Sequence, residues 1–295
     1  MTKKTIHNSP IVEVFGFPII NQSQKAKRYR SQKLCPFNNK VPNCTKDKAN
    51  NPLGVCSIWH GDNSVITCPT RFREEWIIVE NAARFAFGQK NNWTSLSEIK
   101  LVDKNGQSAG NIDFALVAYN DKGELIDFAS LEVQGVYITG NLRNPYETYM
   151  KRPSKDFEWL NGYNYPKPDY LSSSRKRLIP QMLFKGGIIK SWNKKQTVAL
   201  QKSFFDTLPE LPTTTKSKAD IAWFLYDLQY NNTYNQYNLV LIDTVYTEFE
   251  PAVHRVTTPE PGDISHFINV LQSKLNEHLD KNPPDAPSLT DIISS

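Results

Sequence analysis

The chain has 295 residues, 39% of them hydrophobic and 12% aromatic, and this balance is typical of a globular protein with a large buried core. No apolar run reaches the length of a membrane span, and the polar, basic N-terminus lacks the apolar centre of a signal peptide. The sequence therefore predicts a cytoplasmic protein. Its net charge of +5 is compatible with a polyanionic partner but does not by itself require one.

Residues 11–20 form the first strongly apolar segment, which Gly16 and Pro18 interrupt. A cluster of basic residues follows, and it consists of Lys25, Lys27, Arg28, Arg30 and Lys33. Clusters of like charge are usually solvated surface, and we favour that interpretation for this one.

All four cysteines of the chain, Cys35, Cys44, Cys56 and Cys68, lie in one segment rich in turn-forming residues and poor in core residues. Such a segment needs a staple, and in a cytoplasmic protein clustered cysteines favour a metal over disulfides. Four thiolates suit tetrahedral Zn²⁺ or Fe. Because the spacing C-x8-C-x11-C-x11-C lacks the CxxC pairs of common zinc sites, reduced free cysteines remain the alternative. We interpret His60 as a surface residue.

Residues 70–87 predict one amphipathic helix, because apolar side chains recur at helical spacing at Phe72, Trp76, Val79, Ala83 and Phe87. Glu80 flanks this apolar stripe. We interpret it as a boundary residue rather than as an active-site acid.

The most informative stretch is residues 111–134, where two apolar, β-branched runs flank a polar turn at residues 120–123. This pattern predicts an antiparallel hairpin. Each run carries an acid, Asp113 in the first and Glu132 in the second, and a buried carboxylate is costly unless it is paired or bound to a metal. Gln134 is two residues after Glu132, so their side chains share one face of the strand.

This grouping favours metal-dependent phosphodiester hydrolysis. Mg²⁺ prefers hard oxygen ligands, and Asp113, Glu132 and the Val133 carbonyl could supply them. A metal held there would activate water and stabilise the charge of the transition state. Gln134 could orient the attacking water, but its amide cannot carry a positive charge. Two half-exposed acids on an ordinary hairpin are the structural alternative.

Basic residues after the hairpin are candidates for phosphate contacts, and they are Arg143, Lys151, Arg152, Arg175, Lys176 and Arg177. A helix that begins in the serines of residues 172–174 would add its N-terminus as a phosphate site. Further along, we predict a helix over residues 194–208, two strands over residues 219–228 and 238–249, and a closing helix over residues 263–279.

Several of these motifs together resemble the NotI family of type II restriction endonucleases over roughly residues 11–250. They are residues 35–37 (CPF), 54–57 (GVCS), 68–72 (CPTRF), 81–84 (NAAR), and the hairpin with Asp113, Glu132 and Gln134. The resemblance implies an α/β fold: a PD-(D/E)xK nuclease core with a mixed central sheet flanked by helices, plus a small, loop-rich four-cysteine metal domain near the N-terminus. The implied boundaries are residues 1–69 for the metal-binding segment and residues 70–295 for the nuclease with its recognition elements.

The resemblance also implies a prokaryotic homodimer that cuts double-stranded DNA with Mg²⁺ at a palindromic, GC-rich site and leaves 5′-phosphate ends. It implies iron as the metal on the thiolates, Asp113 and Glu132 as ligands of Mg²⁺, and Gln134 in the place of the usual lysine. Ile112 stands where the superfamily pattern has proline. Two alternatives remain open from the residues alone: another nuclease of this superfamily that repairs or nicks DNA, and a non-catalytic, metal-stabilised DNA-binding protein.

Overall fold

The computed structural model describes residues 9–38, 41–48, 50–88, 92–154, 157–159 and 165–281. The chain divides into two compact units, Met1–Thr257 and Thr258–Ser295, each of which is described by itself. The boundary expected at residues 69 and 70 is not tested by this division, and it stays a prediction.

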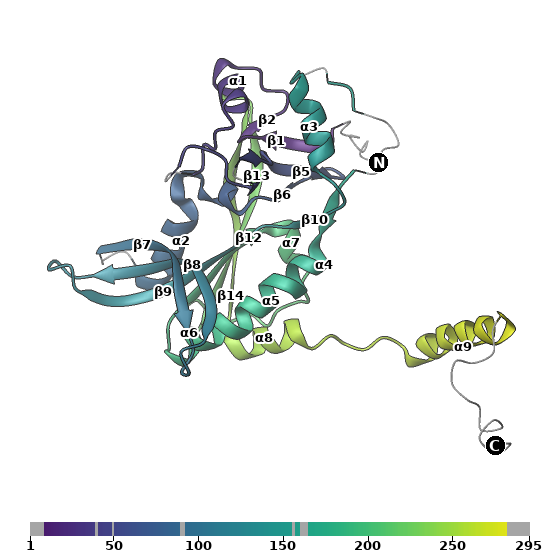
Figure 1. Ribbon diagram of the computed structural model, residues 1–295. Coiled ribbons are helices and arrows are strands. Elements are labelled where there is room, and N and C mark those ends of the chain that lie inside the picture. Colours follow the sequence, from purple (N-terminus) through teal and green to yellow (C-terminus); the bar gives the residue numbers. More distant parts are fainter. Residues whose placement is uncertain are drawn as a thin grey trace. The chain divides into compact units, whose positions relative to one another are not determined.

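The larger unit is organised around a six-stranded sheet with the order β14-β13-β12-β9-β8-β7 (Figure 1). Its strands are β7 (Asn92–Val102), β8 (Ser108–Tyr119), β9 (Leu125–Gln134), β12 (Gln196–Gln201), β13 (Ile221–Asn231) and β14 (Gln236–Thr247). Strand β12 runs parallel to both β9 and β13, whereas the other pairings are antiparallel. The predicted mixed central sheet is therefore confirmed.

The predicted hairpin is confirmed as β8 with β9, and the two strands predicted over residues 219–228 and 238–249 are confirmed as β13 and β14, which pair antiparallel. The β8–β9 hairpin closes through a turn in which Gly123 N donates to Asn120 O at 2.9 Å. The side-chain oxygen of Asn120 accepts from the backbone amides of Lys122 and Glu124, and Gly123 adopts a φ of 79°. Asn and Gly are the residues that such turns require, which explains why the sequence predicted this one.

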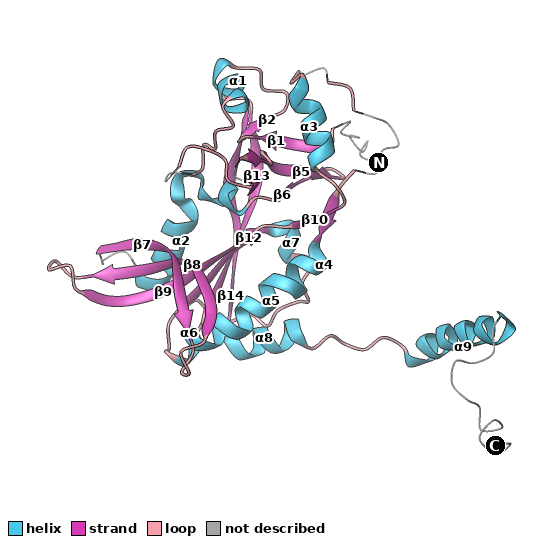
Figure 2. Cartoon of the chain, in the orientation of Figure 1, coloured by secondary structure: helices cyan, strands magenta, loops and turns pink. Residues whose placement is uncertain are grey.

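Helices flank the sheet on both faces (Figure 2). Helix α2 (Ile77–Phe87) packs its apolar residues, among them Ile78 and Ala82, against Phe114 and Leu131 of the β8–β9 hairpin. On the other face, Leu178 packs with β12 and β13 in a second core. Leu178 belongs to a long helix over residues 170–191, which consists of α4 (Tyr170–Ser173), α5 (Ile179–Gln181) and α6 (Gly187–Ser191) joined by π-helical turns at Ser174–Leu178 and Met182–Gly186.

The second core also includes an N-terminal antiparallel sheet with the order β2-β1-β5-β6. The remaining elements of this unit are β1 (Ile11–Val14), β2 (Phe17–Pro18), α1 (Gln24–Ser31), β3 (Asp47–Lys48), β4 (Asn51–Pro52), β5 (Val55–His60), β6 (Asn63–Ile66), a 3-10 helix (Pro69–Trp76), β10 (Tyr137–Thr139), α3 (Arg143–Lys151), β11 (Lys167–Asp169), α7 (Lys202–Phe205) and α8 (Phe249–Thr257). Because Ile11, Val55 and Val65 pack in one core with Val198 and Trp223, the cysteine-bearing segment and the central sheet stabilise one another.

A buried ion network fastens this N-terminal sheet to the rest of the unit. Arg71 is fully buried, and its guanidinium contacts Glu13 of β1 at 3.1 Å and Glu74 at 2.9 Å. It also donates to the backbone carbonyl of Tyr237 in β14 at 2.9 Å, and Ser57 donates to Glu13 at 2.7 Å. One side chain thus ties together three elements that are far apart in the sequence.

Three sequence predictions need correction. Residues 194–208 are not a helix: they hold strand β12, whose six residues are all buried, followed by the short helix α7. The helix predicted over residues 70–87 is a 3-10 helix and α2, separated by non-helical backbone at Glu74 and Glu75. Arg30 is not solvated surface, because it is buried and donates to the carbonyls of Pro18 and Asn21 at 2.6 and 2.7 Å.

The smaller unit contains helix α9 (Ile264–Lys281), which confirms the helix predicted over residues 263–279. Its apolar side chains, including Phe267, Leu271 and Leu275, are exposed. Within the described ranges, no helix combines the length and hydropathy needed to cross a membrane.

Candidate active site

The site lies where β8 separates from β9. The ladder between these strands begins at Phe114 opposite Leu131, so Asp113 is the first residue beyond it. The Asp113 carboxylate accepts a hydrogen bond from the backbone amide of Val133 at 2.8 Å, which holds its side chain against β9 beside Glu132. Ile112, one residue further from the ladder, packs with Ile189 of the long helix instead of with α2. Asp113 therefore owes its position to the end of the regular β8–β9 pairing at Phe114.

Glu132 is mostly buried, and its two carboxylate oxygens have different surroundings. Oε2 accepts from Lys185 Nζ at 2.6 Å. Oε1 is buried and has no hydrogen-bond partner among the described groups. Burial is the main cause that raises the pKa of Glu132 to about 8, the negative charge of Asp113 raises it further, and Lys185 opposes both. Asp113 and Glu132 are close enough to share a hydrogen bond when Glu132 is protonated.

Gln134 follows on the same strand, and it is almost completely buried. Its amide nitrogen donates to the backbone carbonyl of Gly135 at 2.9 Å. That contact uses one of the two amide protons, so the amide oxygen and the second proton remain for other partners. The side chain of Val133 points the other way and joins the core under α2.

Lys185 is the residue of this cluster that the sequence analysis missed. It lies in the second π-helical turn of the long helix, 53 residues from Glu132 in the chain. The only signal in the sequence was a single lysine inside the apolar stretch of residues 178–189. Since π-helical turns shift which residues face the sheet, helical periodicity could not have assigned Lys185 to the side of the acids.

A third acid, Glu98 of β7, lies across from Asp113. The pairs on either side of it are Ser97 with Phe114 and Ile99 with Ile112, so Glu98 and Asp113 face each other in the register. Glu98 has a left-handed φ of 58°, which is costly for a residue other than glycine, and its side chain is exposed. By contrast, Glu80 pairs with Arg84 at 2.7 Å on the exposed face of α2, which fits its interpretation as a boundary residue.

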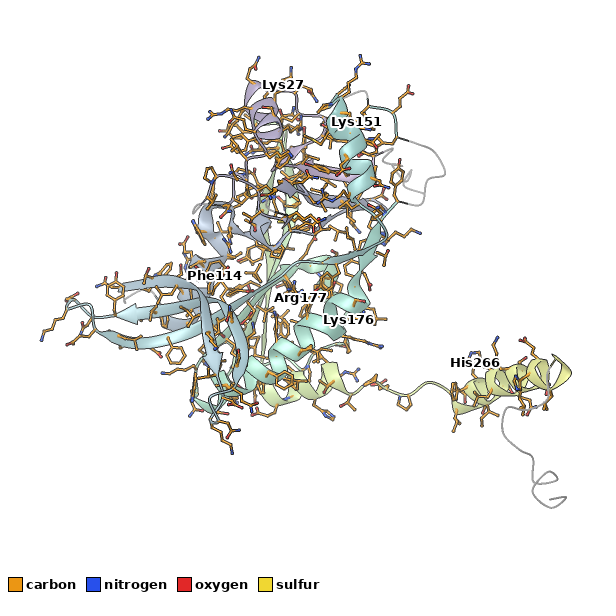
Figure 3. All side chains as sticks on the ribbon, viewed as in Figure 1. Lys27, Phe114, Lys151, Lys176, Arg177 and His266 are labelled. Carbon is orange, nitrogen blue, oxygen red and sulfur yellow. The ribbon has the colours of Figure 1, made fainter. Side chains whose placement is uncertain are left out.

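The candidate phosphate-binding residues come from two elements (Figure 3). Lys151 and Arg152 are exposed at the end of α3, whereas Arg143 at its start already pairs with Asp47 and Glu147. The three basic residues of the long helix, Arg175, Lys176 and Arg177, are exposed, and the Arg177 guanidinium lies 5.2 Å from the ring centre of Tyr137.

The prediction of a phosphate site at a helix N-terminus in the serines of residues 172–174 is wrong. The helix begins at Tyr170, before the serines, and Asp169 caps it by accepting from the Ser172 amide at 2.9 Å. An acid at this position already satisfies the amide that an anion would bind, and its negative charge repels phosphate.

The four cysteines are not joined by disulfides, and three of them, Cys44, Cys56 and Cys68, are buried. Burial is the main cause that raises the pKa of Cys35 to about 11, and the nearby thiols of Cys68 and Cys44 raise it as well. Cys68 also raises the pKa of Cys44 and Cys56, so the four thiols lie in one neighbourhood. Within the described part of the chain, no group of three or more His, Cys, Asp or Glu side chains has an arrangement that could hold a metal ion. The metal site is therefore not confirmed.

Comparison with known proteins identifies the family of this chain. A search of curated proteins found no match. The sequence profile described as "Restriction endonuclease NotI" matches residues 14–239, which is well over half of the chain and includes the cysteines, both acids, Gln134 and Lys185. The chain therefore belongs to the NotI family of restriction endonucleases and is a type II site-specific deoxyribonuclease that acts on double-stranded DNA.

Proposed function

We propose that this enzyme is a Mg²⁺-dependent homodimer with a PD-(D/E)xK core, and that it cuts both strands of a palindromic, GC-rich site to leave 5′-phosphate ends. Asp113 and Glu132 are the metal-binding acids, and Gln134 orients the attacking water. One observation carries the proposal: two adjacent carboxylates, one of them buried with an oxygen that lacks any partner among the described groups. A buried, unsatisfied carboxylate oxygen costs free energy, and a cation offsets that cost.

The donor set suits Mg²⁺, because it consists of hard carboxylate and carbonyl oxygens. Asp113, Glu132 and the Val133 carbonyl are the residues that would hold the ion. When bound, Mg²⁺ lowers the pKa of water and stabilises negative charge on the phosphate. Burial first, and the negative charge of Asp113 second, raise the pKa of Glu132, and a bound cation would oppose both effects.

The chain's own residues orient the reaction. The Val133 amide fixes the Asp113 carboxylate, so this acid does not need to reorganise when substrate binds. Gln134, held through Gly135, presents its amide oxygen as an acceptor for one proton of the attacking water. Phosphate contacts are assigned to Arg143, Lys151, Arg152, Arg175, Lys176 and Arg177, and Arg143 would have to exchange its acidic partners for DNA.

Digestion of a sequenced plasmid tests this function. With Mg²⁺ we expect discrete fragments whose mapped ends are symmetric about a two-fold axis and carry 5′-phosphates, and with EDTA we expect none. Light scattering should report a dimer on DNA, since protein symmetry mirrors that of the site. Fragments with random ends, a single nick, or activity in EDTA would each contradict the proposal.

We further propose that Cys35, Cys44, Cys56 and Cys68 bind one Fe or Zn ion per chain, in a structural role remote from hydrolysis. Its basis is that the four thiols lie near enough to influence one another, although burial is the main cause of their raised pKa values. Thiols must lose their protons to bind a metal as thiolates, and a bound cation favours that loss despite burial.

Elemental analysis of the purified protein should find about one Fe or Zn per chain, and Cys56→Ser should lower both the metal content and the melting temperature. Ser57→Ala, next to it in the same strand, serves as the control and should retain the metal. Absence of stoichiometric Fe and Zn from the parent protein would refute the assignment.

A further inference from the structure

We propose that Lys185 supplies the positive charge of the active site, delivered from the long helix because Gln134 cannot provide it. This inference rests on the proposed function and adds a catalytic residue to it. Phosphodiester hydrolysis builds negative charge on the phosphate oxygens in the transition state, and a positioned cation there contributes strongly to the rate. Gln134 is neutral, so its amide cannot supply that charge.

The contacts of Lys185 place its ammonium group at the acids. Nζ is 2.6 Å from Glu132 Oε2 and 2.8 Å from the carbonyl oxygen of Asn111, which is two residues before Asp113. Lys185 therefore contacts both strands of the catalytic hairpin. An ammonium group has three protons, so after these two hydrogen bonds one remains for a substrate oxygen. No other lysine in the described part of the chain forms an ion pair with Glu132.

Burial makes this charge effective. The Lys185 side chain is only 7% exposed, whereas most lysines keep their ammonium group in water. A desolvated ammonium interacts with nearby negative charge more strongly than an exposed one. Its alkyl chain passes close to Gly110, where a Cβ would lie 3.6 Å from Lys185 Cδ. This would be an ordinary van der Waals contact, so the alkyl chain packs on the backbone of β8.

The helix that carries Lys185 packs against neighbouring side chains at the next residue, Gly186. A Cβ on Gly186 would lie 2.7 Å from Gln196 Oε1 and 3.0 Å from a ring carbon of Phe249, so a larger residue there would require these side chains to shift. Gln196 of β12 donates to the Gly186 carbonyl at 2.9 Å and ties the helix to the sheet. Lys185 itself lies in a π-helical turn, a feature that occurs frequently at functional sites.

The two oxygens of Glu132 allow Lys185 and a metal ion to act together. Lys185 donates to Oε2 of Glu132, whereas Oε1 is buried and has no hydrogen-bond partner among the described groups. A metal on Oε1 therefore does not require Lys185 to leave. A lysine that only neutralised Glu132 in the metal-free protein would become dispensable once the metal binds, and this difference makes the inference testable.

Single-turnover cleavage of a cognate duplex at saturating Mg²⁺ provides the test. We expect Lys185→Met to cut about 100- to 1,000-fold more slowly than the parent, the usual loss when one donor to transition-state charge is removed. Lys185→Arg keeps the charge, so its cleavage rate should be at least tenfold higher than that of Lys185→Met. Adding Gln134→Lys to Lys185→Met should raise the cleavage rate at least tenfold, because it brings a cation back to the face of Glu132.

Lys190→Met is the matched control. Lys190 lies on the same helix and also pairs with an acid, Asp220 at 2.8 Å, away from the catalytic hairpin, so its loss should leave the cleavage rate unchanged. Melting temperature and DNA binding in Ca²⁺ are measured for every variant, and we expect Lys185→Met to stay within a few degrees of Lys190→Met. Rates are compared only after equal DNA occupancy in Ca²⁺ has been verified.

Two results would overturn the role of Lys185. The first is a Lys185→Met rate within threefold of the parent at saturating Mg²⁺. The second is an equal loss in Lys185→Met and Lys185→Arg, because charge would then not be the property that matters. Failure of the proposed function has a different signature: Asp113→Asn would cleave normally. Inactive Asp113→Asn together with active Lys185→Met would contradict this inference alone.

Discussion

Asp113→Asn and Glu132→Gln should each reduce the single-turnover cleavage rate about 1,000-fold or more while leaving specific DNA binding in Ca²⁺ largely intact. Each change removes a carboxylate from the metal, and the loss of several kcal/mol of charge stabilisation corresponds to such a factor, since about 1.4 kcal/mol is tenfold in rate. The double variant should be little worse than either single one, because the two acids act as a unit. Gln134→Ala should be milder than either change.

Glu98→Gln is the control for this pair. Glu98 lies across from Asp113 but is exposed, so neutralising it should cost much less than neutralising either of the two central acids. Parent-like cleavage by Asp113→Asn or by Glu132→Gln would show that the active site has been assigned to the wrong residues, whatever the family membership.

Asp113→Asn should also stabilise the metal-free protein at pH 8. The folded protein raises the pKa of Glu132 from 4.5 to about 8, so the folded state holds this proton more tightly than the unfolded state does. The stability that the proton contributes is complete below about pH 4.5 and is lost as the pH rises through about 8. Removing the charge of Asp113 lowers that pKa and weakens the loss, while the asparagine oxygen can still accept from Val133. Thermal melts of the parent protein and Asp113→Asn in EDTA, at pH values from about 5 to about 9, measure this difference in stability.

Arg71→Met should lower the free energy of unfolding by about 3–5 kcal/mol, the usual cost of removing one partner from a buried ion pair. The change leaves Glu13 fully buried with only Ser57 as a hydrogen-bond donor, and it removes the contact of the guanidinium with Glu74. A loss of this size is a large fraction of the stability of a typical domain. Urea unfolding followed by tryptophan fluorescence measures it.

Arg84→Met is the matched control for Arg71→Met. Arg84 also pairs with a glutamate, Glu80 at 2.7 Å, but both side chains are more than half exposed, so its removal should cost less than about 1 kcal/mol. Equal effects of the two changes would mean that the buried network does not hold the N-terminal sheet in place. The double variant Glu13→Gln with Arg71→Met should recover part of the loss, since it leaves no unpaired charge on Glu13.

Features encoded in neighbouring residues were predictable. The β8–β9 hairpin followed from the turn at Asn120 and Gly123 and from the apolar runs on either side, and α9 followed from its helical spacing. Strand β12 was missed for a physical reason. It is the middle strand of a parallel set and all its residues are buried, so it lacks the alternation by which half-exposed strands are recognised.

Charged residues were harder to place. Arg30 and Arg71 were indistinguishable in the sequence from surface arginines, yet both are buried. Their burial depends on acceptors supplied by the fold: the carbonyls of Pro18 and Asn21 for Arg30, and Glu13 with the Tyr237 carbonyl for Arg71. Composition cannot reveal which basic side chains have such partners.

The sequence by itself determined the family and the β8–β9 hairpin that carries Asp113 and Glu132, because these depend on motifs and on the two-residue period of adjacent strands. Only the tertiary structure placed Lys185 beside Glu132 and Arg71 beside Glu13, contacts that span 53 and 58 residues of chain. Local preferences act over a few residues, whereas these ion pairs form only after packing has brought helix, sheet and N-terminal segment together. The positive charge at the active site is therefore a property of the fold.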